Sequence, residues 1–92
     1  MPHLIHMDVS ELEPPEPMSV ILNELQQLST DTAIRVFHRR RPLPLYSFLQ
    51  KMGYSYHCVE LGVCDVIIYI WPQDDQLLGE FCLQAASQEE SS

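Results

Sequence analysis

The chain has 92 residues, 46% of which are hydrophobic, and a formal net charge of -8 at pH 7. This length and composition suit a single globular domain with a modest core and argue against disorder over most of the sequence. Because 13 acidic residues oppose 5 basic ones, the chain would repel a phosphate backbone, and we expect no nucleic-acid partner.

No apolar run approaches the roughly 20 residues that cross a bilayer, and the amino terminus has no basic segment that leads into an apolar one. We therefore expect a cytoplasmic protein without a membrane partner. The three cysteines, Cys58, Cys64 and Cys82, are too few and too irregularly spaced for a disulfide framework, and no Cys-x-x-Cys pair is present. Reduced thiols are expected.

The first part of the chain predicts a strand, a helix and a second strand. His3 to Val9 mixes apolar and polar residues before an acidic, proline-rich stretch, which fits a strand. From Pro17 to Leu28 the apolar residues recur at offsets of three and four, which predicts a helix. Ala33 to His38 alternates as a strand. Its two faces carry Ile34, Val36 and His38 on one side and Arg35 and Phe37 on the other.

A second helix and a hairpin follow the basic loop from Arg39 to Pro44. Helical spacing returns in a short apolar set that Gly53 can terminate. The set is Leu45, Phe48, Leu49 and Met52. Tyr54 to Glu60 and Cys64 to Trp71 are rich in aromatic and β-branched residues around Gly62, which predicts an antiparallel hairpin.

The register of this hairpin decides which residues face each other. A three-residue loop from Glu60 to Gly62 would set Cys58 opposite Cys64, whereas a two-residue loop would change the partners of one strand. We favour the three-residue loop because it separates apolar from polar faces better. One face then carries Tyr54, Tyr56, Val66, Ile68 and Ile70, and the other carries Ser55, His57, Asp65, Ile67, Tyr69 and Trp71.

After Pro72 the pattern permits two structures. Asp74 could cap a short helix through Leu77, Leu78 and Phe81, or Leu78 to Leu83 could form a strand. Either could cover the sheet face opposite the two helices, and a partner chain could do so instead. We expect a domain over residues 1–72, a segment over 73–86 that packs on the domain or on a partner, and a flexible polar tail over 87–92.

The element order predicts an α+β fold of β-α-β-α-β-β type, a two-layer sandwich with a mixed four-stranded sheet and two helices on one face. In this setting Asp8 and Leu12 precede Pro14-Pro15-Glu16-Pro17. The chain resembles the TusA/SirA-like group, whose members place a Cys-Pro-x-Pro motif between the first strand and the first helix. Pro14 occupies the position of the cysteine.

The resemblance is closer to an uncharacterised bacterial branch of that fold, a domain of unknown function, over about Met7 to Pro72. A sulfur carrier needs a thiolate near a helix amino terminus, and a proline cannot supply it. The resemblance therefore implies the architecture without the persulfide chemistry. The alternative is a sulfur-relay or redox accessory protein in which Cys58 and Cys64 replace the missing thiol.

The carboxyl ends of the first two strands should share one rim of the sheet, where open α/β sheets usually bind ligands. The candidate rim residues are Glu13, Glu16, His38, Arg39, Arg40 and Arg41, joined by Glu11. They could bind a small anion or an acidic group of a partner, or they could be solvated surface pairs. The rim is the best candidate site in the sequence, and of the two interpretations the solvated surface pairs are favoured.

Histidines and cysteines at this spacing do not predict a metal site. His3 and His6 point to opposite faces of one strand, as do His57 and Cys58, so a site would have to assemble across strands or subunits. No catalytic motif or cofactor signature is present in the sequence. We therefore expect no cofactor and a non-catalytic binding or adaptor module, a monomer or weak homodimer, that docks to an unidentified protein partner or a small anion.

Overall fold

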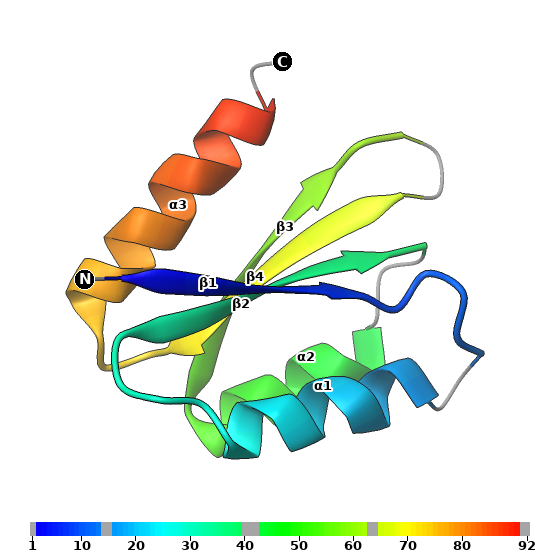
Figure 1. The fold of residues 1–92 in the computed structure, drawn as a ribbon, viewed down its shortest axis with the longest axis horizontal. Coiled ribbons are helices and arrows are strands. Elements are labelled where there is room, and N and C mark those ends of the chain that lie inside the picture. The colour runs from blue at the N-terminus through cyan, green and yellow to red at the C-terminus, as the bar shows by residue number, and fades with distance from the viewer. Residues whose placement is uncertain (1, 14–15, 40–42, 63–64, 91–92) are drawn as a thin grey trace.

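The computed structural model describes residues 2–13, 16–39, 43–62 and 65–90. In these residues the elements are, in chain order, β1 (His3–Asp8), α1 (Glu16–Gln26), β2 (Thr32–His38), α2 (Leu43–Met52), β3 (Tyr54–Glu60), β4 (Val66–Pro72) and α3 (Gln76–Glu90). The prediction of an α+β fold with a mixed sheet is confirmed (Figure 1).

The four described strands form one sheet in the order β1-β2-β4-β3. β1 runs parallel to β2, whereas β4 lies between β2 and β3 and is antiparallel to both. The parallel β1-β2 pair requires a crossover, and α1 supplies it. Consequently the carboxyl ends of β1, β2 and β3 point the same way and form one rim of the sheet (Figure 1).

Both α1 and α2 lie on one face of the sheet (Figure 1). They enclose an apolar core with alternate residues of the strands. Its buried members are Val9, Ile21, Leu25, Ile34, Val36, Leu45, Leu49, Val66, Ile68 and Ile70. Tyr46 of α2 stacks on Tyr56 of β3 with ring centroids 4.2 Å apart. The apolar face predicted for α2 is wider than the face that is buried. Phe48 and Met52 are 45% and 41% exposed, because only one side of the helix meets the sheet.

The opposite face is covered by α3, which forms a third layer (Figure 1). Leu78, Cys82 and Ala86 of the helix are fully buried against a strand face that includes Tyr69 and Trp71. Of the structures expected after Pro72 the helix is therefore the observed one, and it packs on the chain's own sheet. The expected two layers become three.

This helix also differs from the prediction in its start and its length. The side chain of Asp75, rather than that of Asp74, accepts a hydrogen bond from the Leu78 amide at 3.1 Å and caps the first turn. The helix continues to Glu90, so Ser87 to Glu90, expected within a flexible tail, are helical. Polar composition alone suggested fraying, whereas contacts of the last turn with the sheet, described below, hold it in place.

Gly79 explains how closely α3 approaches β4. A Cβ atom at this position would lie 2.7 Å from Nε1 of Trp71. A glycine inside a helix is unfavourable by roughly 1 kcal/mol relative to alanine. Here the missing side chain allows the helix backbone to pack directly on the indole.

The hairpin register differs from the predicted one. Cys58 pairs with Ile68, and Glu60 pairs with Val66, so Cys58 does not face Cys64. Residues 63–64 lie outside the described residues. The pairing of β3 with β4 continues past the predicted start of the loop at Glu60. Glu60 pairs with Val66, and Leu61 donates its amide to the Asp65 carbonyl at 2.9 Å. A shift by an even number of residues leaves every side chain on its face, so the predicted faces are correct although the pairing was wrong.

Candidate functional site

The rim at the carboxyl ends of β1 and β2 is the first candidate site. The Val9 amide donates to the Phe37 carbonyl at 3.0 Å, so the two strands remain joined where the chain leaves the sheet. The amino ends of α1 and α2 lie at the same edge, as does the β3-β4 connection (Figure 1). The topology therefore produces the rim that the sequence predicted.

Asp8 organises the loop that follows β1. Its Oδ1 atom accepts hydrogen bonds from the Ser10 hydroxyl at 2.6 Å and from the Ser10 amide at 3.0 Å. These two bonds, together with the positive charge of Arg39, hold the pKa of Asp8 below its usual value against a small opposing effect of burial. Asp8 thus carries its charge at neutral pH and lies close enough to Arg39 to feel its field.

The predicted rim residues occupy different environments. Glu13 and Arg39 are exposed, and Glu16 is exposed at the first position of α1. His38, the last residue of β2, is 9% exposed and largely inside the fold. Arg40 and Arg41 lie outside the described residues. Of the predicted set, the structure therefore shows Glu13, Glu16 and Arg39 on the surface of this edge.

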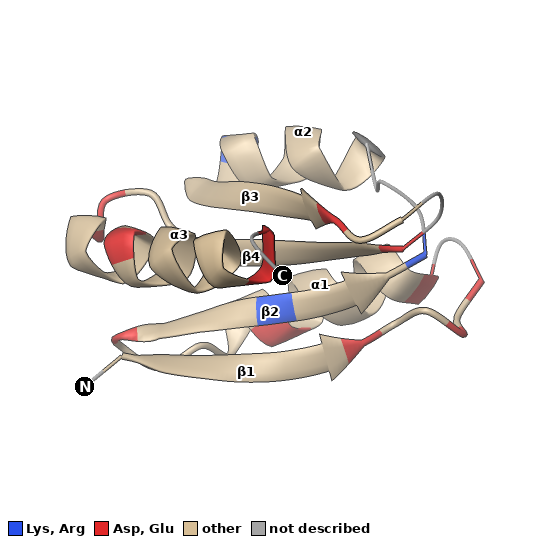
Figure 2. Cartoon of the chain, turned by 90° about the horizontal axis from the view of Figure 1, so that it is seen from above, with Lys and Arg blue, Asp and Glu red and all other residues tan. Residues whose placement is uncertain are grey.

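Acidic groups predominate around the rim, as Figure 2 shows at the ends of the strands and in the loop before α1. The described exposed acids there are Asp8, Glu11, Glu13, Glu16, Glu60 and Asp65. Arg39 is the described cation among them. Leu12 and Leu61, in the two loops of this edge, are 36% and 49% exposed. The described part of the rim therefore combines negative charge with exposed leucines.

The cysteines are not gathered at the rim. Cys58 is half-buried on the face of the sheet that α1 and α2 cover, and Cys82 is fully buried on the side of α3 that faces the sheet. Burial, with a smaller contribution from the charge of Asp75, raises the pKa of the Cys82 thiol to about 11. Cys82 is therefore protonated and unreactive at neutral pH. Cys64 lies outside the described residues.

A second group of polar residues, which sequence reasoning missed, crosses the α3 face of the sheet in one row. The register pairs His6 with Arg35, Arg35 with Tyr69, and Tyr69 with His57, one residue from each strand. We call these four residues the polar row. Glu89 and Glu90, at the carboxyl end of α3, contact it.

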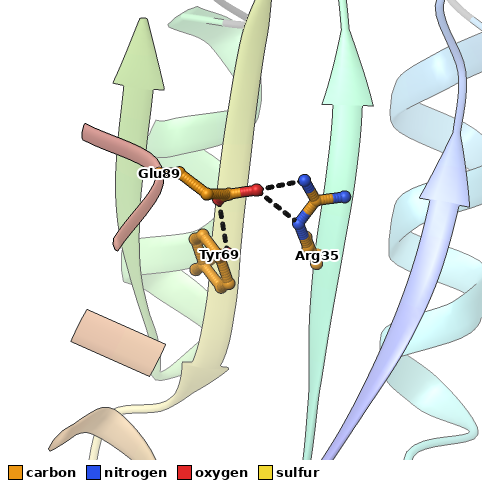
Figure 3. Close-up of polar contacts among 3 residues, drawn as sticks. All are labelled: Arg35, Tyr69 and Glu89. Carbon is orange, nitrogen blue, oxygen red and sulfur yellow. Dashed lines mark hydrogen bonds and ion pairs between the residues drawn. The ribbon is translucent and has the colours of Figure 1, made fainter. Parts of the chain in front are cut away.

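Glu89 binds the centre of the polar row (Figure 3). Its Oε1 accepts hydrogen bonds from Nε of Arg35 at 3.0 Å and from Nη2 of the same side chain, and its Oε2 accepts one from the Tyr69 hydroxyl. Nε2 of His57 lies 2.7 Å from Oε1 of Glu90. Both carboxylates of the helix end are thus held by side chains of the sheet.

The electrostatics of the row follow from this arrangement. Burial and the hydrogen bond to Glu89 raise the pKa of Tyr69 to about 12, although Arg35 opposes the shift. Burial acts to lower the pKa of Arg35, but its hydrogen bonds with Glu89 and Tyr69 outweigh that effect and raise it. Arg35 is therefore charged and Tyr69 neutral at any physiological pH.

Two sequence signals could have indicated the row. Arg35 is a charged residue in the middle of a strand that is otherwise buried, and Tyr69 is the polar residue in the apolar run of β4. A buried charge needs a partner. The partner could not be found without the sheet register and the full length of α3.

Among residues 2–13, 16–39, 43–62 and 65–90, no three His, Cys, Asp or Glu side chains are grouped so that they could hold a metal ion. Within the same residues, no helix combines the length and the apolar character that a membrane span requires.

The fold and its rim define a small α+β domain with a mixed sheet that presents one edge to solvent. Residues 6–72 match the family described as uncharacterized conserved protein (DUF2249). The chain belongs to this family. Neither the curated proteins nor the solved structures contain a match to the chain. The matched region runs from His6, within β1, through α1, β2, α2, β3 and β4, and it ends before α3 begins.

Proposed function

We propose that this chain is a non-catalytic binding module that docks a protein partner at the rim. The observation that supports the proposal is the combination there of exposed acids with the exposed side chains of Leu12 and Leu61. Acidic groups steer a partner of opposite charge, and exposed apolar side chains provide the area that is desolvated on contact. The expected partner therefore presents a positively charged surface with an apolar centre.

A small anion is the less favoured ligand for the rim. Exposed acids such as Glu11 and Glu13 share the rim with Arg39, and Asp8 lies close enough to Arg39 to feel its charge. Negative charge at this density repels an anion at distances within a Debye length, about 8 Å at physiological ionic strength. Anion binding is tested separately, by titration with inorganic phosphate.

The proposal also covers the fold family to which the chain is related and its location in the cell. Two helices on one face of a four-stranded mixed sheet agree with the TusA/SirA-like resemblance, and Pro14 stands where that group has its cysteine. We propose a TusA-like bacterial module of the cytoplasm that has kept the docking architecture and lost the sulfur chemistry. Half-buried Cys58 and fully buried Cys82 favour docking over a sulfur relay.

Charge reversal at the rim tests the docking. Tagged wild-type chain is compared with Glu11→Lys/Glu13→Lys and with Asp74→Lys/Glu80→Lys, a control pair of exposed acids near and on α3. The proposal expects one protein to co-purify with the wild type and the control, to be lost from the rim variant, and to bind in a salt-dependent manner. Retention of that protein by the rim variant would refute it.

Two further experiments test the alternative functions, anion binding and sulfur relay. Titration with inorganic phosphate, followed by backbone amide shifts, would favour the anion if the Arg39 amide moved saturably. A persulfide-labelling assay would favour the relay if a cysteine carried a stable label. The docking proposal expects neither result.

A further inference from the structure

We propose that Arg35 and Tyr69 form a carboxylate-binding site, which Glu89 of the same chain occupies in this structure and which a small external carboxylate occupies when the last turn of α3 lifts. This site is distinct from the rim and does not depend on the proposed docking.

The donors of the site are held by the most rigid part of the fold. Arg35 and Tyr69 are paired residues of β2 and β4, the two strands with a neighbour on either side. Two N–H groups of the Arg35 guanidinium, Nε and Nη2, donate to one oxygen of the carboxylate, and the Tyr69 hydroxyl donates to the other (Figure 3). Arg35 and Tyr69 together therefore bind both carboxylate oxygens, and the planar fork of an arginine is well suited to carboxylate recognition.

The occupant, in contrast, lies on the last turn of α3, which polar contacts rather than apolar packing hold on the sheet. The described apolar contacts of α3 with the sheet end at Ala86, one turn before the end of the helix. Beyond it, Glu89 and Glu90 contact the sheet through charged hydrogen bonds. Helix ends open with a small free energy compared with the buried core. The last turn can therefore lift while Leu78, Cys82 and Ala86 stay buried.

The neighbours of the site are compatible with an anion. In the polar row the residues next to Arg35 and Tyr69 are His6 and His57, which carry no negative charge. The nearby carboxylate of Glu90, which contacts His57, belongs to the same last turn of α3 and leaves with it. The side chains of Arg35 and Glu89 are 25% and 23% exposed, so the carboxylate is already reached by solvent at one side. Once Glu89 leaves, a carboxylate of similar size finds the same three donors.

Acetate provides the probe, because it is the carboxylate group of glutamate with a single methyl. The experiment follows the ¹⁵N and ¹H shifts of Arg35 Nε in wild type, in Glu89→Ala and in Glu80→Ala, an exposed glutamate of the same helix. Sodium acetate is titrated against sodium chloride at equal ionic strength. We expect a saturable acetate-specific shift in Glu89→Ala, and at least about tenfold weaker binding to wild type and Glu80→Ala, since their own carboxylate competes from within the chain.

The controls make the result decisive. Addition of Arg35→Lys to Glu89→Ala should abolish the shift of the Tyr69 amide, because lysine lacks the planar pair of donors. If Glu89→Ala does not fold, Glu89→Met is used, since methionine keeps the length of the side chain and the helix propensity but removes the carboxylate oxygens that occupy the site. A folded variant whose Arg35 Nε or Tyr69 amide responds equally to acetate and chloride overturns the proposal, and so does equal acetate affinity in wild type and variant.

Discussion

The two faces of the sheet are built differently. On the α1 and α2 face, ten of the described residues form a buried apolar core, and the helices are the crossovers that connect the strands. On the other face, one helix that connects no strands covers the sheet, with an apolar first part and a charged last turn. The first face lies almost wholly within the family match, whereas α3 lies beyond its end at Pro72. The chain connections between strands thus place the helices on the first face, whereas side-chain contacts hold α3 on the second.

Removal of α3 is the strongest challenge to this comparison. Truncation after Pro72 uncovers a sheet face that includes Ile67, Tyr69 and Trp71. We expect the loss of more than about 5 kcal/mol of stability, comparable with the whole free energy of unfolding of a small domain, so the truncated chain should unfold or self-associate. Circular dichroism and light scattering after size exclusion measure this. A folded monomer with the wild-type melting temperature would show that the second face needs no cover.

A matched pair of leucines compares the faces directly. Leu49 of α2 and Leu78 of α3 are 0% exposed, one on each face. Replacement by alanine should destabilise the fold by about 2–5 kcal/mol in each case, through lost burial and the cavity left behind. Urea unfolding gives both values. A loss below about 1 kcal/mol for Leu78→Ala, with a normal loss for Leu49→Ala, would mean that α3 is not part of the cooperative unit.

Alkaline pH should weaken the α3 face selectively. The pKa values of Cys82 and Tyr69 are raised to about 11 and about 12 by burial, from ordinary values of 9.0 and 10.0. The unfolded chain therefore releases these protons first, so the stability is complete below pH 9 and is lost as pH rises towards 12. Tyr69 alone should account for roughly 2–3 kcal/mol.

Denaturant unfolding from pH 8 to 11.5 measures this loss, and Tyr69→Phe is the control. Phenylalanine cannot ionise, so the variant should be less stable than wild type at pH 8 but should lose less stability above pH 10. Parallel curves for the two proteins would contradict the assignment to Tyr69.

The smallest of these effects concerns the close approach of α3 to β4. Gly79→Ala favours an isolated helix but places a methyl group against the indole of Trp71, so we expect a net destabilisation of about 1–3 kcal/mol. Gly62→Ala is the control, since a Cβ there meets nothing within 4 Å. Thermal unfolding and Trp71 fluorescence report the difference. A stabilised Gly79→Ala variant would show that the helix can move away without loss.

Sequence patterns were sufficient for the parts of the molecule that depend on local periodicity. The alternation in Ala33 to His38 assigned each side chain to its correct face, and the crossovers predicted the rim. The hairpin pairing was wrong because the predicted and observed registers differ by four residues, an even number that buries the same side chains, so the pattern cannot choose between them.

The α3 face was less predictable because its determinants are distant in the sequence. The polar composition of Ser87 to Glu90 predicted a flexible tail. The last turn of the helix is instead held by the hydrogen bond between Glu89 and Arg35, which are 54 residues apart in the sequence. Likewise, the polar row needs four strands in a known order before its members become neighbours. At the rim, the burial of His38 depended on packing at the end of β2, which the composition of the loop does not show.

The position of β4 between β2 and β3 has a consequence for synthesis on the ribosome. Until residues 66–72 have emerged, β3 has no strand to pair with, and β2 still lacks one of its two neighbours. Pairing across such sequence distances is slow, and unpaired strands are exposed to aggregation in the meantime. We therefore expect the nascent sheet to close late, when its most apolar strand inserts into a gap that the earlier strands have left open.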